Sequence, residues 1–112
     1  MKAFLLLVIP GALFAQQPPK AGDPQNGKKL FERDGCYECH GHVAQGGSAG
    51  ARLAPKPIPF AAFLAYVRRP TDQMPPFTSK VVSDKDLADI YAYLQSIPAP
   101  PAVKDIPQLK NY

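Results

Sequence analysis

The sequence predicts an all-α fold, a small domain of about three main helices joined by long loops rich in glycine and proline. Three segments carry apolar residues at helical spacing, and no segment of useful length alternates apolar and polar residues as a strand does. Fourteen prolines and eight glycines among 112 residues predict long connections without regular structure. A chain of this length holds one domain and little more.

The first residues are typical of an export signal and not of the folded domain. Lys2 precedes an apolar run over residues 3–14, and the run is followed by Ala15. This run is about twelve residues long, whereas a membrane-spanning helix needs about twenty. We therefore predict a secretory signal peptide over residues 1–15 and a flexible lead-in over residues 16–22. The mature chain is expected in the periplasm or another extracytoplasmic space, without a stable membrane span.

The first predicted helix extends from Asp23 to about Asp34. Asp23 is a favoured N-cap residue, Pro24 suits the first helical position, and a glycine directly after Asp34 ends the helix. Further along the chain, residues 41–57 contain too many glycines for regular structure and are predicted to form a loop.

Two more helices complete the predicted domain, which spans residues 23–97. One covers residues 60–68 and is bounded by a proline on each side. The other begins at Ser83, which resembles the start of a capping box because Asp86 follows three residues later. The tail, residues 98–112, contains four prolines and is predicted to run extended.

Residues 36–40 read Cys-Tyr-Glu-Cys-His and carry the strongest chemical signal in the chain. Two thiols three residues apart on one helical turn can each form a thioether to the same haem, and the following histidine supplies a neutral imidazole to the iron. Chance produces this arrangement in about one of three thousand chains with two cysteines and two histidines. We therefore predict one covalently attached haem c, with Cys36 and Cys39 as thioether residues and His40 as proximal iron ligand.

Other uses of these side chains are weaker. A thioredoxin-like dithiol requires a βαβ context, which is absent from the sequence pattern. A zinc site would crowd Cys36, Cys39, His40 and His42 into seven residues, which is poor tetrahedral geometry. A disulfide between the two cysteines would cross-link almost nothing.

The neighbours of these residues are expected at the surface. His42 lies two residues beyond His40 and cannot easily reach the opposite face of the same iron, so a surface position is predicted for it. Tyr37 and Glu38 stand between the two cysteines and are predicted to face solvent.

Met74 is the predicted second iron ligand, on the distal side. Its thioether is a soft ligand suited to haem iron, and His/Met ligation raises the reduction potential. It is the only methionine besides Met1, and it lies between two predicted helices in a loop stiffened by Pro75 and Pro76. The alternative is that Met74 fills a gap in the core, as most methionines do.

The chain resembles the class I c-type cytochromes over residues 23–97. The resemblance rests on residues 36–40, on Met74-Pro75 and on the paired terminal helices. It implies a small cytochrome c fold in which the helices wrap around one covalently attached haem. It also implies that the first and last helices cross at Gly27 and Phe31 on one side and at Ile90, Tyr93 and Leu94 on the other.

The resemblance further implies which groups surround the haem. In this family the carbonyl of a Gly-Pro-x-Leu segment orients the proximal histidine; here residues 50–53 align best, with Ala51 in place of the proline, and Pro55 is a second candidate. Residues Arg52, Phe63, Val67 and Phe77, together with Phe60 and Leu64, are predicted to line the haem pocket. Residues Arg52, Arg68 and Arg69 are candidates to meet the haem propionates, or else ordinary surface charges.

A haem with both axial positions filled favours one-electron transfer. We predict an exported electron carrier, not an enzyme, whose donors and acceptors are redox proteins. Two alternatives stay open: an electron-transfer subunit of a larger dehydrogenase or oxidase, suggested by the tail, and a haem enzyme or a protein that binds gas or peroxide if Met74 dissociates. A net charge of +4 does not indicate a nucleic-acid partner. The lysines Lys28, Lys29, Lys56, Lys80 and Lys85 either form a docking rim for an acidic partner or are ordinary surface residues.

Overall fold

The computed structural model of the protein describes residues 22–110, so the predicted signal peptide lies outside the described residues. Over this range the chain forms helices and loops without strands, which confirms the predicted all-α class. No helix within residues 22–110 is both long enough and apolar enough to cross a membrane. The elements in chain order are α1 (Pro24–Arg33), α2 (Cys36–His40), α3 (Phe60–Arg68), α4 (Asp84–Ser96) and the short 3-10 helices η1 (Val103–Asp105) and η2 (Pro107–Leu109).

Helix α1 begins and ends at the residues that its sequence predicts. The Asp23 carboxylate accepts hydrogen bonds from the amide N–H groups of Gln25 (2.9 Å) and Asn26 (3.2 Å), and Pro24 occupies the first helical position. Gly35 adopts a left-handed φ of 75°. This conformation ends α1 and lets the chain turn directly into α2.

Helix α4 begins at the predicted capping box. The Ser83 hydroxyl accepts a hydrogen bond from the Asp86 N–H (3.1 Å), and the Asp86 carboxylate accepts one from the Ser83 N–H (3.2 Å). Two backbone N–H groups that lack an intrahelical partner are thereby satisfied, which fixes the start of α4.

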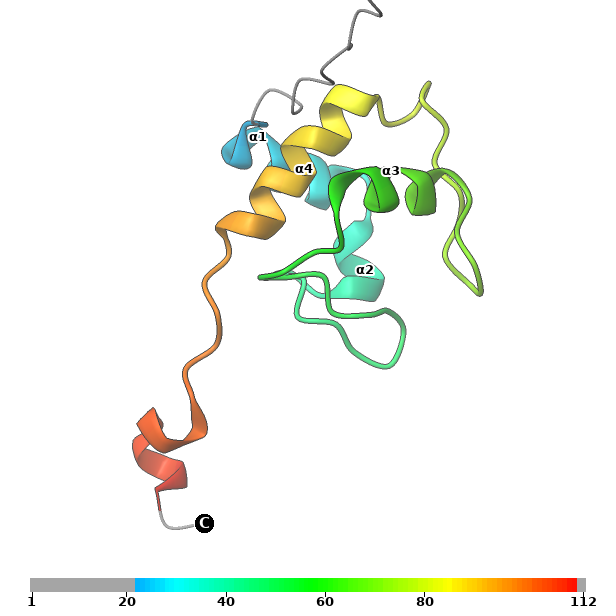
Figure 1. Cartoon of the computed structure of the whole chain (residues 1–112). Helices are drawn as coiled ribbons and strands as arrows, with labels where there is room; N and C mark the ends of the chain where they lie inside the picture. The colour runs from blue at the N-terminus through cyan, green and yellow to red at the C-terminus, as the bar shows by residue number, and fades with distance from the viewer. Residues whose placement is uncertain (1–21, 111–112) are drawn as a thin grey trace, which may run out of the picture.

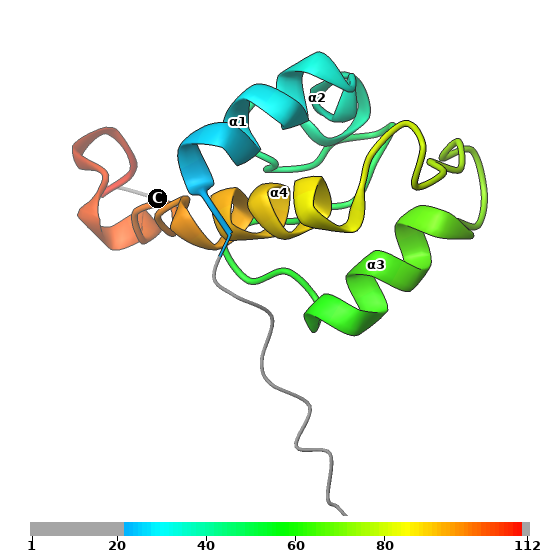
Figure 2. The ribbon, with the colours of Figure 1, turned by 90° about the horizontal axis from the view of Figure 1, so that it is seen from above.

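Helices α1 and α4 lie against each other and form the main packing contact of the fold (Figure 1, Figure 2). Gly27 permits this close approach, because a Cβ atom there would come within 1.9 Å of the Asp89 carbonyl oxygen. One turn further along, Phe31 packs edge-on against Tyr93, with ring centroids 5.6 Å apart. The helix pair therefore meets at residues that the family resemblance implies.

A buried carboxylate joins the same two helices. The side chain of Asp89 accepts hydrogen bonds from the Asp23 N–H, from Asn26 Nδ2 and from Lys85 Nζ, each at 2.8 Å. Asp89 is only 3% exposed. Burial alone would raise the pKa of this carboxyl, but the hydrogen bonds outweigh it and hold the pKa below its ordinary value. The charge is thus compensated inside the helix interface.

Helix α3 packs on α4 through aromatic side chains. The Tyr91 ring lies 5.2 Å from that of Phe60 and 5.4 Å from that of Phe63, measured between centroids. The Tyr91 hydroxyl donates to the Ile58 carbonyl oxygen just ahead of α3 (3.0 Å). One apolar core unites these helices and the intervening loops; its buried residues are Leu30, Phe31, Ala44, Ala54, Phe63, Val67, Val82, Leu87, Ile90, Tyr93 and Leu94.

The tail after α4 differs from its prediction. Residues 98–102 have no regular structure, but η1 and η2 fill most of residues 103–109. The prediction of an extended tail is wrong for these residues, because their single proline, Pro107, takes the first position of η2, where a missing N–H costs little. The segment leads away from the helices, as its orange and red ribbon shows (Figure 1).

Candidate functional site

Helix α2 holds the Cys-Tyr-Glu-Cys-His segment as five residues directly after α1. Both cysteines have free thiols; Cys36 is half-buried and Cys39 is exposed. The His40 side chain comes from the last residue of the same short helix. Two thiols and one imidazole therefore extend from little more than one helical turn.

The Cys36 thiol is not suited to thiol–disulfide exchange. Burial, reinforced by the nearby Asp34 carboxylate, raises its pKa to about 11. Such a thiol stays protonated at neutral pH, whereas exchange requires a thiolate. Within residues 22–110, no group of three or more Cys, His, Asp or Glu side chains lies closely enough together to hold a metal ion.

The His40 ring is fixed by a backbone carbonyl. Its Nδ1 lies 2.7 Å from the Ala51 carbonyl oxygen, and because a carbonyl only accepts, Nδ1–H is the donor. In the neutral ring the other nitrogen, Nε2, then carries the lone pair. The partner belongs to the predicted segment, residues 50–53, and is the residue that replaces the expected proline, while Pro55 is not used.

Gly50 explains how this loop comes so close to α2. A Cβ atom at this position would lie 2.7 Å from the Cys39 carbonyl oxygen and 3.0 Å from His40 Nδ1. Any larger residue would push the loop away from the helix and lengthen the hydrogen bond to the imidazole.

Met74 lies in the loop between α3 and α4 and is half-buried. It packs against the apolar core, as do Cys36 of α2 and Phe77 further along the same loop. Phe63 and Val67 of α3 are themselves buried members of that core. The fold thus brings five of the predicted site residues, from three different parts of the chain, onto one apolar cluster.

Arg68 is not a free surface charge. Its Nη1 donates to the carbonyl oxygens of Phe77 (2.9 Å) and Val82 (2.8 Å), and its Nη2 pairs with the Asp84 carboxylate at 2.5 Å. Sequence reasoning named this arginine for its charge and missed its bonds to the loop. The signal in the sequence for these bonds is that Arg68 lies in the last turn of a predicted helix and is followed by a proline-rich loop. Arg69, the next candidate, is exposed.

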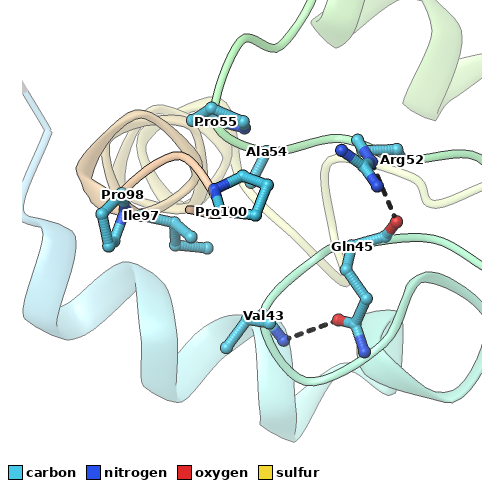
Figure 3. A pocket seen from close by; sticks show the side chains of 8 residues that line it. All are labelled: Val43, Gln45, Arg52, Ala54, Pro55, Ile97, Pro98 and Pro100. Atoms are coloured by element: carbon cyan, nitrogen blue, oxygen red, sulfur yellow. Dashed lines mark hydrogen bonds between the residues drawn. The ribbon is translucent and has the colours of Figure 1, made fainter. Parts of the chain in front are cut away.

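Arg52 is not a member of the apolar cluster that contains the other predicted pocket residues. It is exposed, and its Nε donates to the Gln45 carbonyl oxygen at 3.3 Å (Figure 3). It lines a small pocket of about 120 Å³ beside the start of the tail. No predicted thioether or iron ligand lines this pocket, whose lining consists of Val43, Gln45, Arg52, Ala54, Pro55, Ile97, Pro98 and Pro100.

His42 is exposed, as predicted, but the prediction for Tyr37 is wrong. The two rings stack with centroids 4.6 Å apart, and Tyr37 is half-buried because it also packs against the core. The His42 carbonyl oxygen accepts a hydrogen bond from the buried Tyr93 hydroxyl (2.9 Å). Glu38 is exposed as expected.

The comparison with known families identifies the family of the chain. Residues 22–94 match the family described as cytochrome c oxidase, cbb3-type, subunit III. The chain belongs to this family of c-type cytochrome domains. No curated protein and no solved structure matches the chain. As a c-type cytochrome domain it works with haem c and its iron in electron transfer.

The described residues of the cytochrome domain fit a haem c group. Both thiols are free for thioether formation, and the His40 Nε2 lone pair is left available by the bond that Nδ1 makes. A set of apolar side chains also packs against the core while keeping part of its surface uncovered, as the rim of a haem site requires. This set comprises Leu53, Phe60, Leu64, Met74 and Phe77.

Proposed function

We propose that the protein is an exported one-electron carrier with one haem c, attached through Cys36 and Cys39 and ligated at iron by His40 and Met74. When bound, the haem supplies a reversible one-electron iron couple. If His40 and Met74 both bound the iron, no position on the metal would be left for a substrate. Electron transfer to and from other redox proteins is then the chemistry that remains.

One observation carries this proposal. His40, the last residue of the Cys-Tyr-Glu-Cys-His helix, donates a 2.7 Å hydrogen bond from Nδ1–H to the Ala51 carbonyl oxygen in the following loop. The bond selects the tautomer whose Nε2 can bind a metal, orients the ring and increases its basicity. A histidine used only on the surface has no need of a glycine-dependent loop to hold it.

Met74 is supported as the second ligand by its chemistry and its surroundings. Its sulfur is a soft donor, and its side chain packs on the same core as Cys36. His40 and Met74 belong to different elements, so each can be held independently of the other.

The remaining predicted residues have supporting roles in this proposal. The apolar side chains of Phe63, Val67 and Phe77 exclude water from the site, which favours the reduced state with its lower charge. The exposed Arg52 guanidinium makes one hydrogen bond to Gln45 and keeps further N–H donors for a haem propionate. Among the lysines proposed for partner docking, Lys85 is already paired with Asp89.

Replacement of Met74 by leucine tests the proposal, because leucine fills a similar volume and cannot bind iron. In the purified holoprotein we expect loss of the weak far-red absorption band of Met-ligated ferric haem, a lower reduction potential and prompt binding of carbon monoxide. Leu30→Met, the reverse exchange at a buried position of α1, serves as the matched control and should change none of these properties.

Two results would contradict the assignment. If Met74→Leu keeps the spectrum and potential of the wild type, Met74 fills the core and is not a ligand. If the wild-type protein itself binds carbon monoxide at once, the iron has an open position, and a haem enzyme or a gas-binding protein becomes the better description.

The export signal has a direct test as well. Mass spectrometry of the protein from the extracytoplasmic fraction should show a chain that begins after Ala15 and carries the mass of one haem. A full-length chain in the cytoplasm would contradict the export part of the proposal.

A second candidate, an electron-transfer subunit of a larger oxidase or dehydrogenase, is favoured by the tail. Residues 95–110 lie beyond the family match, and Val103 (62% exposed) and Leu109 (38% exposed) present apolar surface there. Deleting residues 98–112 should release the protein from such a complex during native purification and leave its haem spectrum unchanged. A wild-type protein that purifies as a monomer, with the same electron-transfer rates after the deletion, would exclude this role.

A further inference from the structure

The loop that carries Met74 is closed at its base by Arg68. The Phe77 N–H donates to the Val67 carbonyl oxygen (3.1 Å), and the Phe77 carbonyl accepts from Arg68 Nη1 (2.9 Å). Phe77 is therefore bound to the end of α3 through both of its backbone polar groups. The same Arg68 nitrogen reaches Val82 (2.8 Å), just before α4 begins.

Arg68 is suited to this task by its shape and burial. Its side chain is only 19% exposed, and its planar guanidinium reaches two carbonyls and one carboxylate at once. Hydrogen bonds from a charged donor are stronger than those between neutral groups, and they strengthen when water is excluded. The Asp84 partner is 69% exposed, so the bonds to the two carbonyls are the better protected part of the arrangement.

The segment next to Met74 cannot anchor itself. Pro75 and Pro76 have no backbone N–H to donate, so the first amide after Met74 that can bind the protein is that of Phe77. The two prolines also have fixed φ angles, which limits the freedom of the backbone between Met74 and Phe77. A constraint applied at Phe77 is therefore passed on to Met74.

We propose that Arg68 is a positioning residue for Met74: by binding the carbonyls of Phe77 and Val82 it holds the loop in the conformation that keeps the Met74 sulfur on the iron. The inference rests on the proposed His/Met ligation and adds the residue that determines how firmly Met74 is held on the iron. A loop ordered in advance loses little conformational entropy when its sulfur binds. Without this anchor, an external ligand displaces Met74 more easily.

Arg68→Met removes the guanidinium and keeps much of the apolar part of the side chain. Arg68→Lys keeps the charge but loses the planar group that reaches several acceptors at once. We expect Arg68→Met to raise the affinity of the ferric holoprotein for imidazole, which competes with Met74, by about tenfold or more. A tenfold change corresponds to about 1.4 kcal/mol, near the lower limit for one hydrogen bond to a charged group. Arg68→Lys should lie between this variant and the wild type.

Hydrogen exchange provides a readout that does not depend on the iron ligands. In Arg68→Met the Phe77 amide should exchange about tenfold faster, while amides in the middle of α4, such as that of Ile90, should keep their protection. A merely structural loss of stability would accelerate both. If Arg68→Met does not accumulate as holoprotein, Arg68→Lys is measured in the same two assays.

Two control variants separate the effect of the guanidinium contacts to the two carbonyls from the effect of positive charge alone. Lys80→Met removes one positive charge from the same loop at an exposed position, and Asp84→Asn removes the ion pair but not the carbonyl contacts. Both should change imidazole affinity by less than about threefold, because exposed charges contribute little.

The outcomes distinguish this inference from the proposed function. If Arg68→Met matches Lys80→Met in both imidazole affinity and Phe77 exchange, Arg68 does not position the loop, and the Met74→Leu variant still decides separately whether Met74 is a ligand. If the wild type lacks the Met-ligated spectrum, the ligation proposal fails first. Faster Phe77 exchange would then establish Arg68 as an anchor of the loop alone and overturn its assigned role toward the iron.

Discussion

Replacing Asp89 by asparagine isolates the contribution of the buried carboxylate between α1 and α4. The substitution keeps the size of the side chain but removes its charge and converts one acceptor oxygen into an NH₂ donor. In the wild type the Asp23 amide donates to Oδ1 and the Asn26 side chain donates to Oδ2, both at 2.8 Å, so in the variant one bond is weakened and the other loses its acceptor. A hydrogen bond to a charged group contributes about 1.5–3 kcal/mol and one between neutral groups about 0.5–1.5 kcal/mol. One weakened bond and one lost bond together cost about 2.5–4.5 kcal/mol, with the exposed Lys85 left out.

The stabilisation that the Asp89 carboxylate provides depends on pH and decreases as the pH falls. Hydrogen bonding outweighs burial and lowers the pKa of Asp89 in the folded protein. The contribution of a carboxylate with a lowered pKa is fully present above its unfolded value of about 3.9 and is lost as pH falls through the folded value. The stability difference between wild type and Asp89→Asn should thus be full at neutral pH and shrink below about pH 4.

Denaturant unfolding of the two holoproteins, followed by circular dichroism at several pH values, measures this difference. Asp105→Asn, the same chemical change at an exposed position of η1, is the matched control and should alter the unfolding free energy by less than about 0.5 kcal/mol. A neutral-pH difference below that limit for Asp89→Asn would refute the reasoning, as would a difference that stays constant down to about pH 3.

The same unfolding assay tests two further residues of the helix interface. Gly27→Ala should destabilise the protein by about 1–3 kcal/mol, because its Cβ would lie 1.9 Å from the Asp89 carbonyl oxygen and force the helices apart. Gly47→Ala is its control, since no atom lies within 4 Å of the Cβ there, and equal effects of the two variants would contradict the close-approach argument. Tyr93→Phe should cost about 0.5–1.5 kcal/mol, because it removes the hydrogen bond to the His42 carbonyl and keeps the packing on Phe31; an unchanged stability would show that this bond contributes nothing.

The features that local sequence predicts well are those with local causes. The N-cap at Asp23, the capping box at Ser83 and the stop at Gly35 each depend on residues within about one turn, and all three are found where they are predicted. The spacing of the two cysteines and His40 is also local, because it is set by a single helical turn. Tyr37 shows the limit of such reasoning, since its burial depends on contacts with residues beyond its own turn.

The order of residues by itself determined the three main helices, their ends and the set of side chains suited to one haem, because propensity, capping and ligand chemistry act over a few neighbouring residues. Only the tertiary structure decided which carbonyl orients His40, which charge holds the loop of Met74 and which polar group is buried between α1 and α4. Ala51 is eleven residues from His40, and Asp89 is 66 residues from the Asp23 amide that it accepts from. Contacts over such separations depend on how the helices pack, and helix packing is a property of the whole chain rather than of any short segment.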